Sequence, residues 1–537
     1  MRIGVLDILT DMRLSGAFAH LYAVYFRKQI ASIMPQAISV WCRQLGHEVF
    51  YSTYFGLGDP RDLMPRDLDI LFVSTYTQAS ALAYALGKLY RRDGVRTVIG
   101  GPHARAFPQD CARFFDLVVR DCDQELIGDI LAGRFDPPQI VTSGRPLREI
   151  PTVRERMPEI RRAAFVRGRP GLASIAPMLS SLGCPYRCDF CVDWNTDYVA
   201  LPGEQLEADL RYVSEQYPGL MVGFHDPNFA VRFEQTMAIL ERIPPGRRPG
   251  YLMESSLSIL KRDRLARLRD TNCVYVAPGI ESWTGYSNKA GASGKSGREK
   301  LEQVIDHVRL IGDYVPGIQA NFLVGSDADR GAEPAELTRE FVRRLPGVWP
   351  TVNFPAPFGG TPLHDSYMRE DRVLRALPFT FYHVPYLAIR PRHYELCDYY
   401  TQLISIFETI VSARMMGRRV RTPSHPIVLF INMLRTFAAG RELRLLKRIR
   451  RKLASERQFR AFHEGESREL PVFYRMQLRR RLGPYAELLS LEDLMPVLTD
   501  AAPVNSDRAF GPRSPRRVAS TDEPSPHRTN ASVSAGT

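Results

Sequence analysis

The sequence predicts an α/β protein in three parts: a doubly wound parallel sheet, a second and curved parallel sheet, and a helical region. Short apolar runs of strand length alternate with longer helical stretches in residues 1–130, and they do so again in residues 171–375. Such alternation is typical of parallel sheets that carry helices on both faces. Strand-like runs stop after residue 376, which predicts the helical region.

The first sheet is expected to have five strands, with helices between them. The apolar runs that predict these strands lie at residues 3–9, 47–54, 69–75, 96–101 and 116–121. The stretches 33–46 and 81–94 are expected to be helices, and 107–115 a short one. Ligands of such sheets bind beyond the carboxyl ends of the strands, so a site is expected there.

A connector rich in Pro and Arg, residues 137–162, is expected to run between the two sheets as a linker. Six strand–helix units follow it, which predicts a second parallel sheet curved into a partial barrel. The strands of this sheet are expected at residues 174–183, 220–226, 250–256, 273–282, 318–325 and 351–358.

The last part is expected to be helical, with residues 394–416 as its clearest helix and a basic segment at 441–460. The end of the chain is rich in Ser, Pro, Arg and Thr and has too few apolar residues to order itself. The predicted division is into residues 1–150, 151–375, 376–500 and a disordered tail, 501–537.

Composition sets limits on the location of the protein. The chain has 537 residues, a net charge of +13 and eight cysteines. It contains no run of about 18 apolar residues, so no membrane-spanning helix is expected. The first residues lack the pattern of a signal peptide, and we expect free thiols in a reducing cytoplasm. Most of the positive charge is interpreted as solvated helix surface.

Three cysteines, Cys184, Cys188 and Cys191, directly follow the strand expected at 174–183. Three thiolates on one short loop can converge on one metal centre. A structural zinc ion needs four ligands, and no fourth Cys or His lies nearby in the sequence. A catalytic zinc with three ligands remains an alternative. The other interpretation is a four-iron cluster with three protein ligands and one open iron.

The spacing of these cysteines, with Phe190 before the last one, resembles the signature of the radical S-adenosylmethionine (radical SAM) superfamily. The resemblance implies a [4Fe-4S] cluster on Cys184, Cys188 and Cys191, whose open iron chelates S-adenosylmethionine. Reductive cleavage of that molecule would give a 5′-deoxyadenosyl radical. An external electron donor such as flavodoxin or ferredoxin is implied as a partner.

The ends of later strands extend this resemblance. The stretch Gly223–Phe229 resembles the turn that follows the second strand in the superfamily, and a small residue after the fifth strand would let adenine approach. The resemblance implies that S-adenosylmethionine binds to Phe190, Glu254, Glu281, Ser282 and Gly325. A glutamate at a strand end is a capping or salt-bridged residue as often as it is a binding residue. That structural role is the alternative for Glu254 and Glu281.

A doubly wound domain ahead of the cysteines resembles the cobalamin-binding class of the superfamily, and Val98–Ala104 looks like its strand-four turn. Glycines there would let the corrin or its nucleotide tail approach the backbone. The resemblance implies cobalamin-binding residues at Met34, Pro35, Ser74, Thr75, Gly100 and Gly101.

Two departures from that class are visible. The Asp-x-His-x-x-Gly motif is absent, which implies that no protein ligand holds the lower face of cobalt. Residues 118–125, VVRDCDQE, replace the Gly-Glu-Gly-Glu run of relatives. The alternative is a domain that keeps the fold and holds no cobalamin.

The combined resemblance implies a cobalamin-dependent radical SAM methyltransferase that acts on an unactivated carbon of a small-molecule or lipid substrate. Radical rearrangement or ring formation without methyl transfer, and a non-catalytic iron–sulfur redox protein, are the alternatives. Residues 441–453 suit peripheral contact with an anionic membrane, or an ordinary solvated helix. Residues 381–384 either close the substrate cavity or pack in the core. No RNA-binding module is visible, so nucleic acid is not an expected partner.

Overall fold

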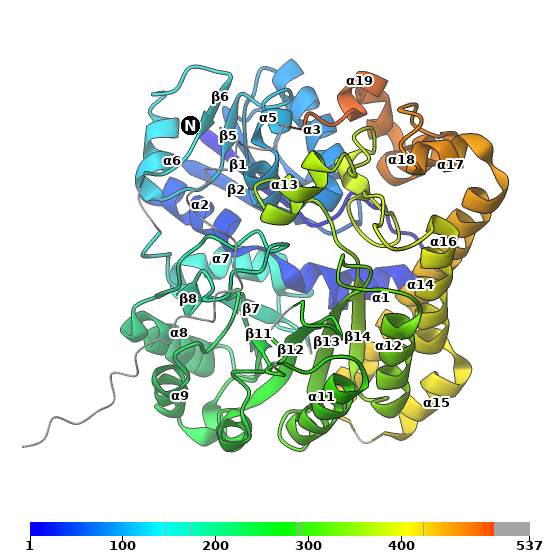
Figure 1. Cartoon of the computed structure of the whole chain (residues 1–537). Coiled ribbons are helices and arrows are strands. Elements are labelled where there is room, and N and C mark those ends of the chain that lie inside the picture. The colour runs from blue at the N-terminus through cyan, green and yellow to red at the C-terminus, as the bar shows by residue number, and fades with distance from the viewer. Residues whose placement is uncertain (145–146, 172, 287–288, 293, 423, 499–537) are drawn as a thin grey trace, which may run out of the picture. The chain divides into compact units, whose positions relative to one another are not determined.

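A six-stranded parallel sheet forms the first part of the chain in the computed structural model (Figure 1). The structure describes residues 1–144, 147–171, 173–286, 289–292, 294–422 and 424–498. The strand order is β2-β1-β3-β4-β5-β6, which places the first strand inside the sheet. The strands are β1 (Arg2–Ile8), β2 (Glu48–Tyr54), β3 (Ile70–Thr75), β4 (Arg96–Gly100), β5 (Leu117–Val119) and β6 (Gln139–Val141).

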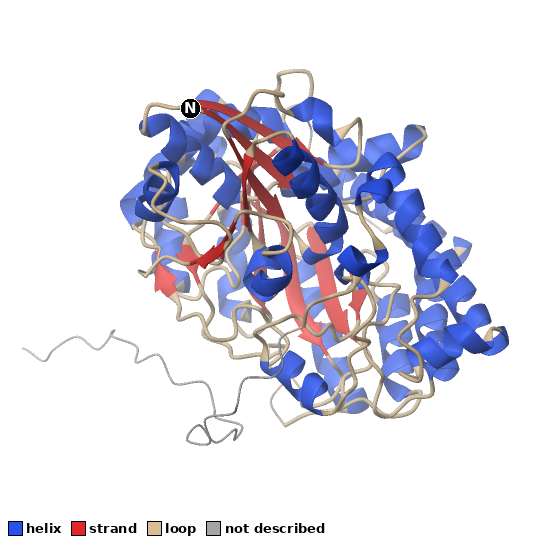
Figure 2. Cartoon of the chain, turned by 90° about the horizontal axis from the view of Figure 1, so that it is seen from above, coloured by secondary structure: helices blue, strands red, loops and turns tan. Residues whose placement is uncertain are grey.

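Helices cover both faces of this sheet because successive side chains of a buried strand alternate between two cores. On β1, Ile3 and Val5 join one core, whereas Leu6 and Ile8 join the other. Figure 2 shows the strands in red with helices on both sides. These helices are α2 (Ile33–Gln44), α3 (Ser80–Arg92), α4 (Pro102–Ala106), α5 (Pro108–Cys111) and α6 (Gln124–Leu131).

The connector between the sheets is not a linker, and that prediction is wrong. Part of it is β6, which pairs in parallel with β5 and adds a sixth strand to the sheet. Another part is a helix, α7, which contacts α2 and β7. Thr152 and Glu155 form a capping box at its start, so the helix forms despite Pro158 inside it. The bounds of α7 are Val153–Ala164.

The second sheet also has six strands, and every pair of neighbours is parallel. Its order, β14-β13-β12-β11-β10-β7, follows the chain, and the sheet is open between β14 and β7. Its strands are β7 (Ile175–Met178), β10 (Met221–Phe224), β11 (Tyr251–Ser256), β12 (Cys273–Glu281), β13 (Gly317–Leu323) and β14 (Trp349–Asn353). Its helices are α8 (Gly203–Gln216), α9 (Phe233–Glu241), α10 (Leu265–Asp270), α11 (Gly297–Gly312), α12 (Glu333–Arg344) and α13 (Pro362–Arg369).

The remainder of the described chain is helical, as predicted. The basic segment continues α16, a helix of 30 residues in which Leu446, Ile449 and Leu453 are buried. Of the described helices, none is long and apolar enough to cross a membrane. The predicted disordered tail lies outside the described residues. The helices are α14 (Leu396–Val411), α15 (Ala413–Arg421), α16 (Pro426–Ser455), α17 (Arg457–His463), α18 (Val472–Leu482) and α19 (Leu491–Leu494).

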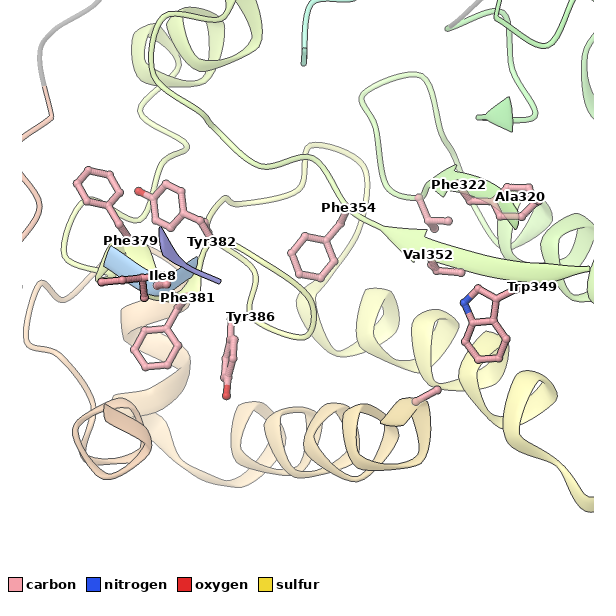
Figure 3. Packing of buried hydrophobic residues seen from close by; sticks show 14 of the residues in the cluster. Ile8, Ala320, Phe322, Trp349, Val352, Phe354, Phe379, Phe381, Tyr382 and Tyr386 are labelled. Atoms are coloured by element: carbon pink, nitrogen blue, oxygen red, sulfur yellow. The ribbon is translucent and has the colours of Figure 1, made fainter. Parts of the chain in front are cut away.

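The stretch after the second sheet packs in the core. Phe379, Phe381, Tyr382 and Tyr386 are buried in the same cluster as Ile8 of β1, and Figure 3 shows these aromatic rings close together. The ring centroids of Phe381 and Tyr386 lie 4.7 Å apart in an edge-to-face arrangement. Core packing therefore accounts for the aromatic residues at 381 and 382.

A buried ion pair joins the helical region to the first sheet. Arg481 of α18 donates from Nε to Oδ1 of Asp11, just after β1, over 2.9 Å. Thr380 donates to the other oxygen of the same carboxylate. Removing one partner of such a pair leaves an uncompensated buried charge, which is strongly destabilising. The contact therefore couples α18 to the end of the first strand.

Candidate functional site

The three clustered cysteines lie on one loop between two short antiparallel strands, β8 (Ser181–Leu182) and β9 (Val199–Ala200). Cys184 is buried, Cys188 and Cys191 are half-buried, and all three thiols are free. The loop folds on its own backbone, since Cys191 N–H donates to the carbonyl of Cys188 over 3.1 Å. Cys184 N–H likewise donates to the carbonyl of Thr196 over 3.3 Å.

Lys289 lies beside the cysteine loop, and its ammonium group is a positive charge that acts on all three thiols. Burial raises the pKa of all three thiols, that of Cys188 to about 12, and the Lys289 ammonium opposes this rise. Burial alone would lower the pKa of Lys289, but Cys188 and Glu281 hold it above its usual value. Metal binding requires thiolates, so a fixed cation here favours the ligand form of the cysteines.

The cysteines suit an iron–sulfur cluster better than a zinc ion. Among the described residues, no group of three or more His, Cys, Asp or Glu side chains is arranged to hold one metal ion. A single zinc ion draws each sulfur to about 2.3 Å from the same point. A four-iron cluster is larger, and it binds each thiolate to a different iron. Three neighbouring free thiols beside a cation fit that group.

Glu254 and Glu281 come from neighbouring strands and face the same cation. Glu281 Oε1 lies 3.8 Å from Nζ of Lys289, and Lys289 lowers the pKa of both carboxyl groups. Burial is the larger effect and raises both pKa values. The side chain of Glu254 nevertheless keeps surface that is exposed to solvent. Within the described part of the chain, its carboxylate has no hydrogen-bond or ion-pair partner.

The backbone at Glu281 is unusual. Its φ is +63°, and the pairing of β12 with β13 shifts register between Gly279 and Glu281. A bulge at the end of a strand re-aims the side chain that follows it. Phe190 of the cysteine loop lies under Lys289, 5.9 Å from its ring centroid to Nζ. The structure thus brings Phe190, Glu254 and Glu281 together around one lysine.

Ser282 and Gly325 meet at a different side chain, Asp329. The Ser282 hydroxyl donates to Asp329 Oδ1 over 2.9 Å, and Gly325 N–H donates to Oδ2 over 2.8 Å. Gly325 has a φ of +87°, and a Cβ there would lie 2.3 Å from the ring of Tyr399. The glycine is therefore needed for packing against α14. Contact of adenine with Gly325 stays a prediction.

Four of the residues predicted for cobalamin adjoin one another at the carboxyl edge of the first sheet. Ser74 pairs in register with Gly100, and Thr75 ends β3. Gly101 has a φ of +88°, and a Cβ on it would lie 2.9 Å from Ser74 Oγ. A Cβ on Gly100 would have its nearest neighbour, the carbonyl oxygen of Val119, at 3.7 Å, which is an ordinary van der Waals distance. The space beside Gly100 fits the close approach of a flat group to the backbone.

Met34 and Pro35 lie in the first turn of α2. Pro35 is buried, and Met34 packs against the core that contains Ile3 and Val5. Asp7 connects this helix to the strand edge. It accepts one hydrogen bond from Ser32 N–H over 2.8 Å and one from the Ser32 hydroxyl over 3.3 Å, and Ser74 also acts on its carboxylate. Burial raises the pKa of Asp7 to about 6, although both serines lower it.

Arg105 of α4 connects the carboxyl edge of the first sheet to the cysteine loop, because it donates to Asp193 over 3.1 Å and to Thr196 over 3.0 Å. Tyr76 follows β3 at the same edge, and its hydroxyl lies 3.4 Å from Ser32 Oγ. Burial raises the pKa of Tyr76, and the negative charges of Asp7 and Glu254 raise it further. The predicted cobalamin edge and the predicted cluster loop are therefore in direct contact.

Comparison with known proteins gives relatives of one kind. No family model matches this chain. A bacteriochlorophyllide d C-8(2)-methyltransferase of Chlorobaculum tepidum is 23% identical over 396 residues, which cover 70% of this chain and 84% of that protein. A hopanoid C-2 methylase of Rhodopseudomonas palustris is 26% identical over 208 residues, 36% of this chain and 38% of that protein.

One solved structure shows the fold. OxsB, a cobalamin-dependent S-adenosylmethionine radical enzyme solved with aqua-cobalamin bound, has a TM-score of 0.52 at 11% identity. The match covers 91% of this chain and 79% of OxsB. This chain is similar in fold to a cobalamin-dependent S-adenosylmethionine radical enzyme and similar in sequence to methyltransferases. The resemblance carried by the cysteine spacing is confirmed, and the sequence relatives of the chain are methyltransferases.

Sequence reasoning missed three residues of this site: Asp7, Tyr76 and Arg105. A signal existed for Asp7, which interrupts the apolar strand GVLDIL, because a buried carboxylate must have partners. Tyr76 and Arg105 gave no such signal. Each matters through a partner that is distant in sequence, 88 residues away for Arg105 and Asp193.

Proposed function

We propose that this chain is a cobalamin-dependent radical SAM methyltransferase that methylates an unactivated carbon of a small-molecule or lipid substrate. The observation that carries the proposal is the contact between the two strand edges. Arg105 of α4, next to the edge of the first sheet, donates to Asp193 and Thr196 on the cysteine loop, and the charges of Asp7 and Glu254 both raise the pKa of Tyr76. Two cofactors bound at these edges would face the same space.

The residues divide between the two edges. Cys184, Cys188 and Cys191 would hold the [4Fe-4S] cluster, and Lys289 would offset the negative charge of their thiolates. S-adenosylmethionine would bind to Phe190, Glu254, Glu281, Ser282 and Gly325. Cobalamin would bind to Met34, Pro35, Ser74, Thr75, Gly100 and Gly101. When bound, the cluster supplies an electron to cleave S-adenosylmethionine, and cobalamin supplies the methyl group.

The chain contributes position and charge. The carboxylate of Glu254 has no hydrogen-bond partner among the described residues, so it can accept hydrogen bonds from a ligand with N–H or O–H groups. Arg105 fixes the cysteine loop against α4 through two hydrogen bonds. Holding two reactants in a fixed geometry is a large part of enzymatic rate enhancement. The domains proposed are residues 1–150 for cobalamin, 151–375 for the radical SAM core and 376–500 as the helical region.

The test is an anaerobic reconstitution with iron, sulfide and hydroxocobalamin, followed by reduction with S-adenosylmethionine present. We expect the absorption of a four-iron cluster, retained cobalamin, and formation of both 5′-deoxyadenosine and S-adenosylhomocysteine. The first product without the second would replace methylation with rearrangement or ring formation. Iron without either product would indicate a redox protein. Bound zinc without iron would overturn the proposal.

A further inference from the structure

Two helices from opposite ends of the chain present aromatic side chains to solvent. They are α1 (Ala17–Tyr25) and α16, which Figure 1 shows close to each other. The rings of Phe18 and Phe437 are 4.7 Å apart, and those of Tyr25 and Phe430 are 5.8 Å apart. Leu21, Phe430 and Phe437 are 40%, 38% and 50% exposed. We call these five residues the aromatic seam.

Arginines continue the same face of α16. Arg441, Arg444 and Arg448 follow Phe437 by 4, 7 and 11 residues, which returns each of them to the same side of the helix. All three are exposed. Within the described residues, none of them has a carboxylate partner. We call these three residues the basic stripe.

The inner face of α16 points toward the second sheet. Arg435 of α16 donates to the hydroxyl of Tyr275 on β12 over 2.8 Å and also to Gln319 on β13. Glu442 is turned inward too, and burial raises its pKa to about 7 while Arg27 and Arg435 lower it. The aromatic seam thus lies one helix layer, about 10 Å, from the strands that carry the proposed site.

We propose that the aromatic seam and the basic stripe dock this protein on an anionic lipid bilayer. A contiguous apolar patch rimmed by charge marks an interaction site. Aromatic rings prefer the interfacial layer of a bilayer, and arginines are attracted to anionic headgroups. No described helix spans a membrane, so the contact is peripheral. The contact itself is independent of the proposed function, whereas the supply of an apolar substrate from the bilayer would rest on it.

A second copy of the chain is a poorer occupant. A two-fold contact places the same patch on both partners. Arg441, Arg444 and Arg448 have no carboxylate partner among the described residues, so they would then face their own copies, and like charges repel. An anionic surface pairs with the whole stripe.

The test is flotation of the full chain with vesicles of phosphatidylcholine, alone or mixed with phosphatidylglycerol. We expect binding about tenfold stronger on the mixed vesicles, because each arginine near the surface adds to the attraction. Phe437→Glu should weaken that binding about tenfold. The pair Arg441→Glu and Arg444→Glu should weaken it at least as much and reduce its dependence on salt.

Matched substitutions elsewhere control for the change of charge. Val420→Glu alters an exposed apolar residue, 56% exposed, on α15, and Arg247→Glu alters an exposed arginine beside the second sheet. Both should bind as the unmodified chain does, and thermal unfolding checks that every variant is folded.

Three results would overturn the inference: equal binding to both vesicles, binding that survives the seam and stripe variants, or a dimer that Phe437→Glu dissociates. Loss of flotation with intact cleavage of S-adenosylmethionine would refute the docking alone. Flotation by a chain that assembles no cluster would refute the proposed function alone.

Discussion

The carboxyl edges of the two sheets differ in how far their polar groups satisfy one another. At the first edge, Asp7 already accepts hydrogen bonds from both the backbone N–H and the hydroxyl of Ser32. At the second edge, the carboxylate of Glu254 has no hydrogen-bond partner among the described residues. The positively charged ammonium of Lys289 lies there beside three thiols. A satisfied edge suits a large ligand with few charges. The unsatisfied edge suits ligands that bring charge with them, such as a cluster and a sulfonium amino acid.

The largest effect is expected from a substitution at the second edge. Cys188→Ala removes one of three thiolates, so the reconstituted chain should lose the cluster and the formation of 5′-deoxyadenosine together. Cys397→Ala, which alters a half-buried cysteine of α14, should keep both. Iron content per chain and product formation are the measurements. Full iron content in Cys188→Ala would refute the ligand assignment.

The next effect concerns the first edge and pH. Burial raises the pKa of Asp7 from 3.8 to about 6, so the folded state favours the protonated carboxyl. The stability from this group is fully present below pH 3.8 and is lost as pH rises through about 6, a change of about 3 kcal/mol. Asp7→Asn should remove this part of the pH dependence.

The measurement for Asp7 is the unfolding midpoint at several pH values, compared between Asp7→Asn and the unmodified chain. The difference between the two should grow as pH rises through about 6 and should be small in acid. Asp62→Asn alters an exposed carboxylate near the same sheet and serves as the control. A constant difference at all pH values would show that Asp7 does not titrate in this range.

A pair of glycines tests whether the first edge does more than fold. Gly101→Ala should destabilise the fold by about 1–2 kcal/mol, because φ is +88° and the new Cβ would contact Ser74. Gly100→Ala has room for its Cβ and should leave the unfolding midpoint unchanged. It should nevertheless lower cobalamin retention. Unchanged retention in both variants would indicate that the domain keeps only the fold.

The smallest expected effect is on the contact between the edges. Arg105→Ala removes two hydrogen bonds, to Asp193 and Thr196, from a partly exposed arginine. We expect S-adenosylhomocysteine formation to fall several-fold, while 5′-deoxyadenosine formation falls less, because each cofactor keeps its own ligands. Arg120→Ala, at an exposed site after β5, is the control. An equal fall in both products would show that Arg105 serves only the cysteine loop.

The sequence predicted those parts of the fold that depend on local pattern. Buried strands such as β3 and β12 are visible in the sequence as apolar runs. The three cysteines lie on one loop, so their spacing is visible in the sequence as well. The connector was misread because Pro and Arg usually mark linkers, whereas Thr152 and Glu155 cap a helix there. The contact of Arg105 with the cysteine loop could not be predicted, because it depends on how two sheets pack. Gly325 gave an ambiguous signal, since cofactor contact and packing against Tyr399 both require glycine.

The buried pair of Asp11 and Arg481 has a consequence for synthesis. The two residues are 470 positions apart, so a ribosome adding about 5–20 residues per second makes Asp11 roughly half a minute to a minute and a half before its partner. Through that interval the nascent first sheet carries a carboxylate that cannot yet be buried at low cost. A chain cut short before α18 would keep that defect permanently. A chain without α18 therefore differs from one with α18 by an unpaired carboxylate at Asp11, and chaperones and proteases act on such incompletely folded chains.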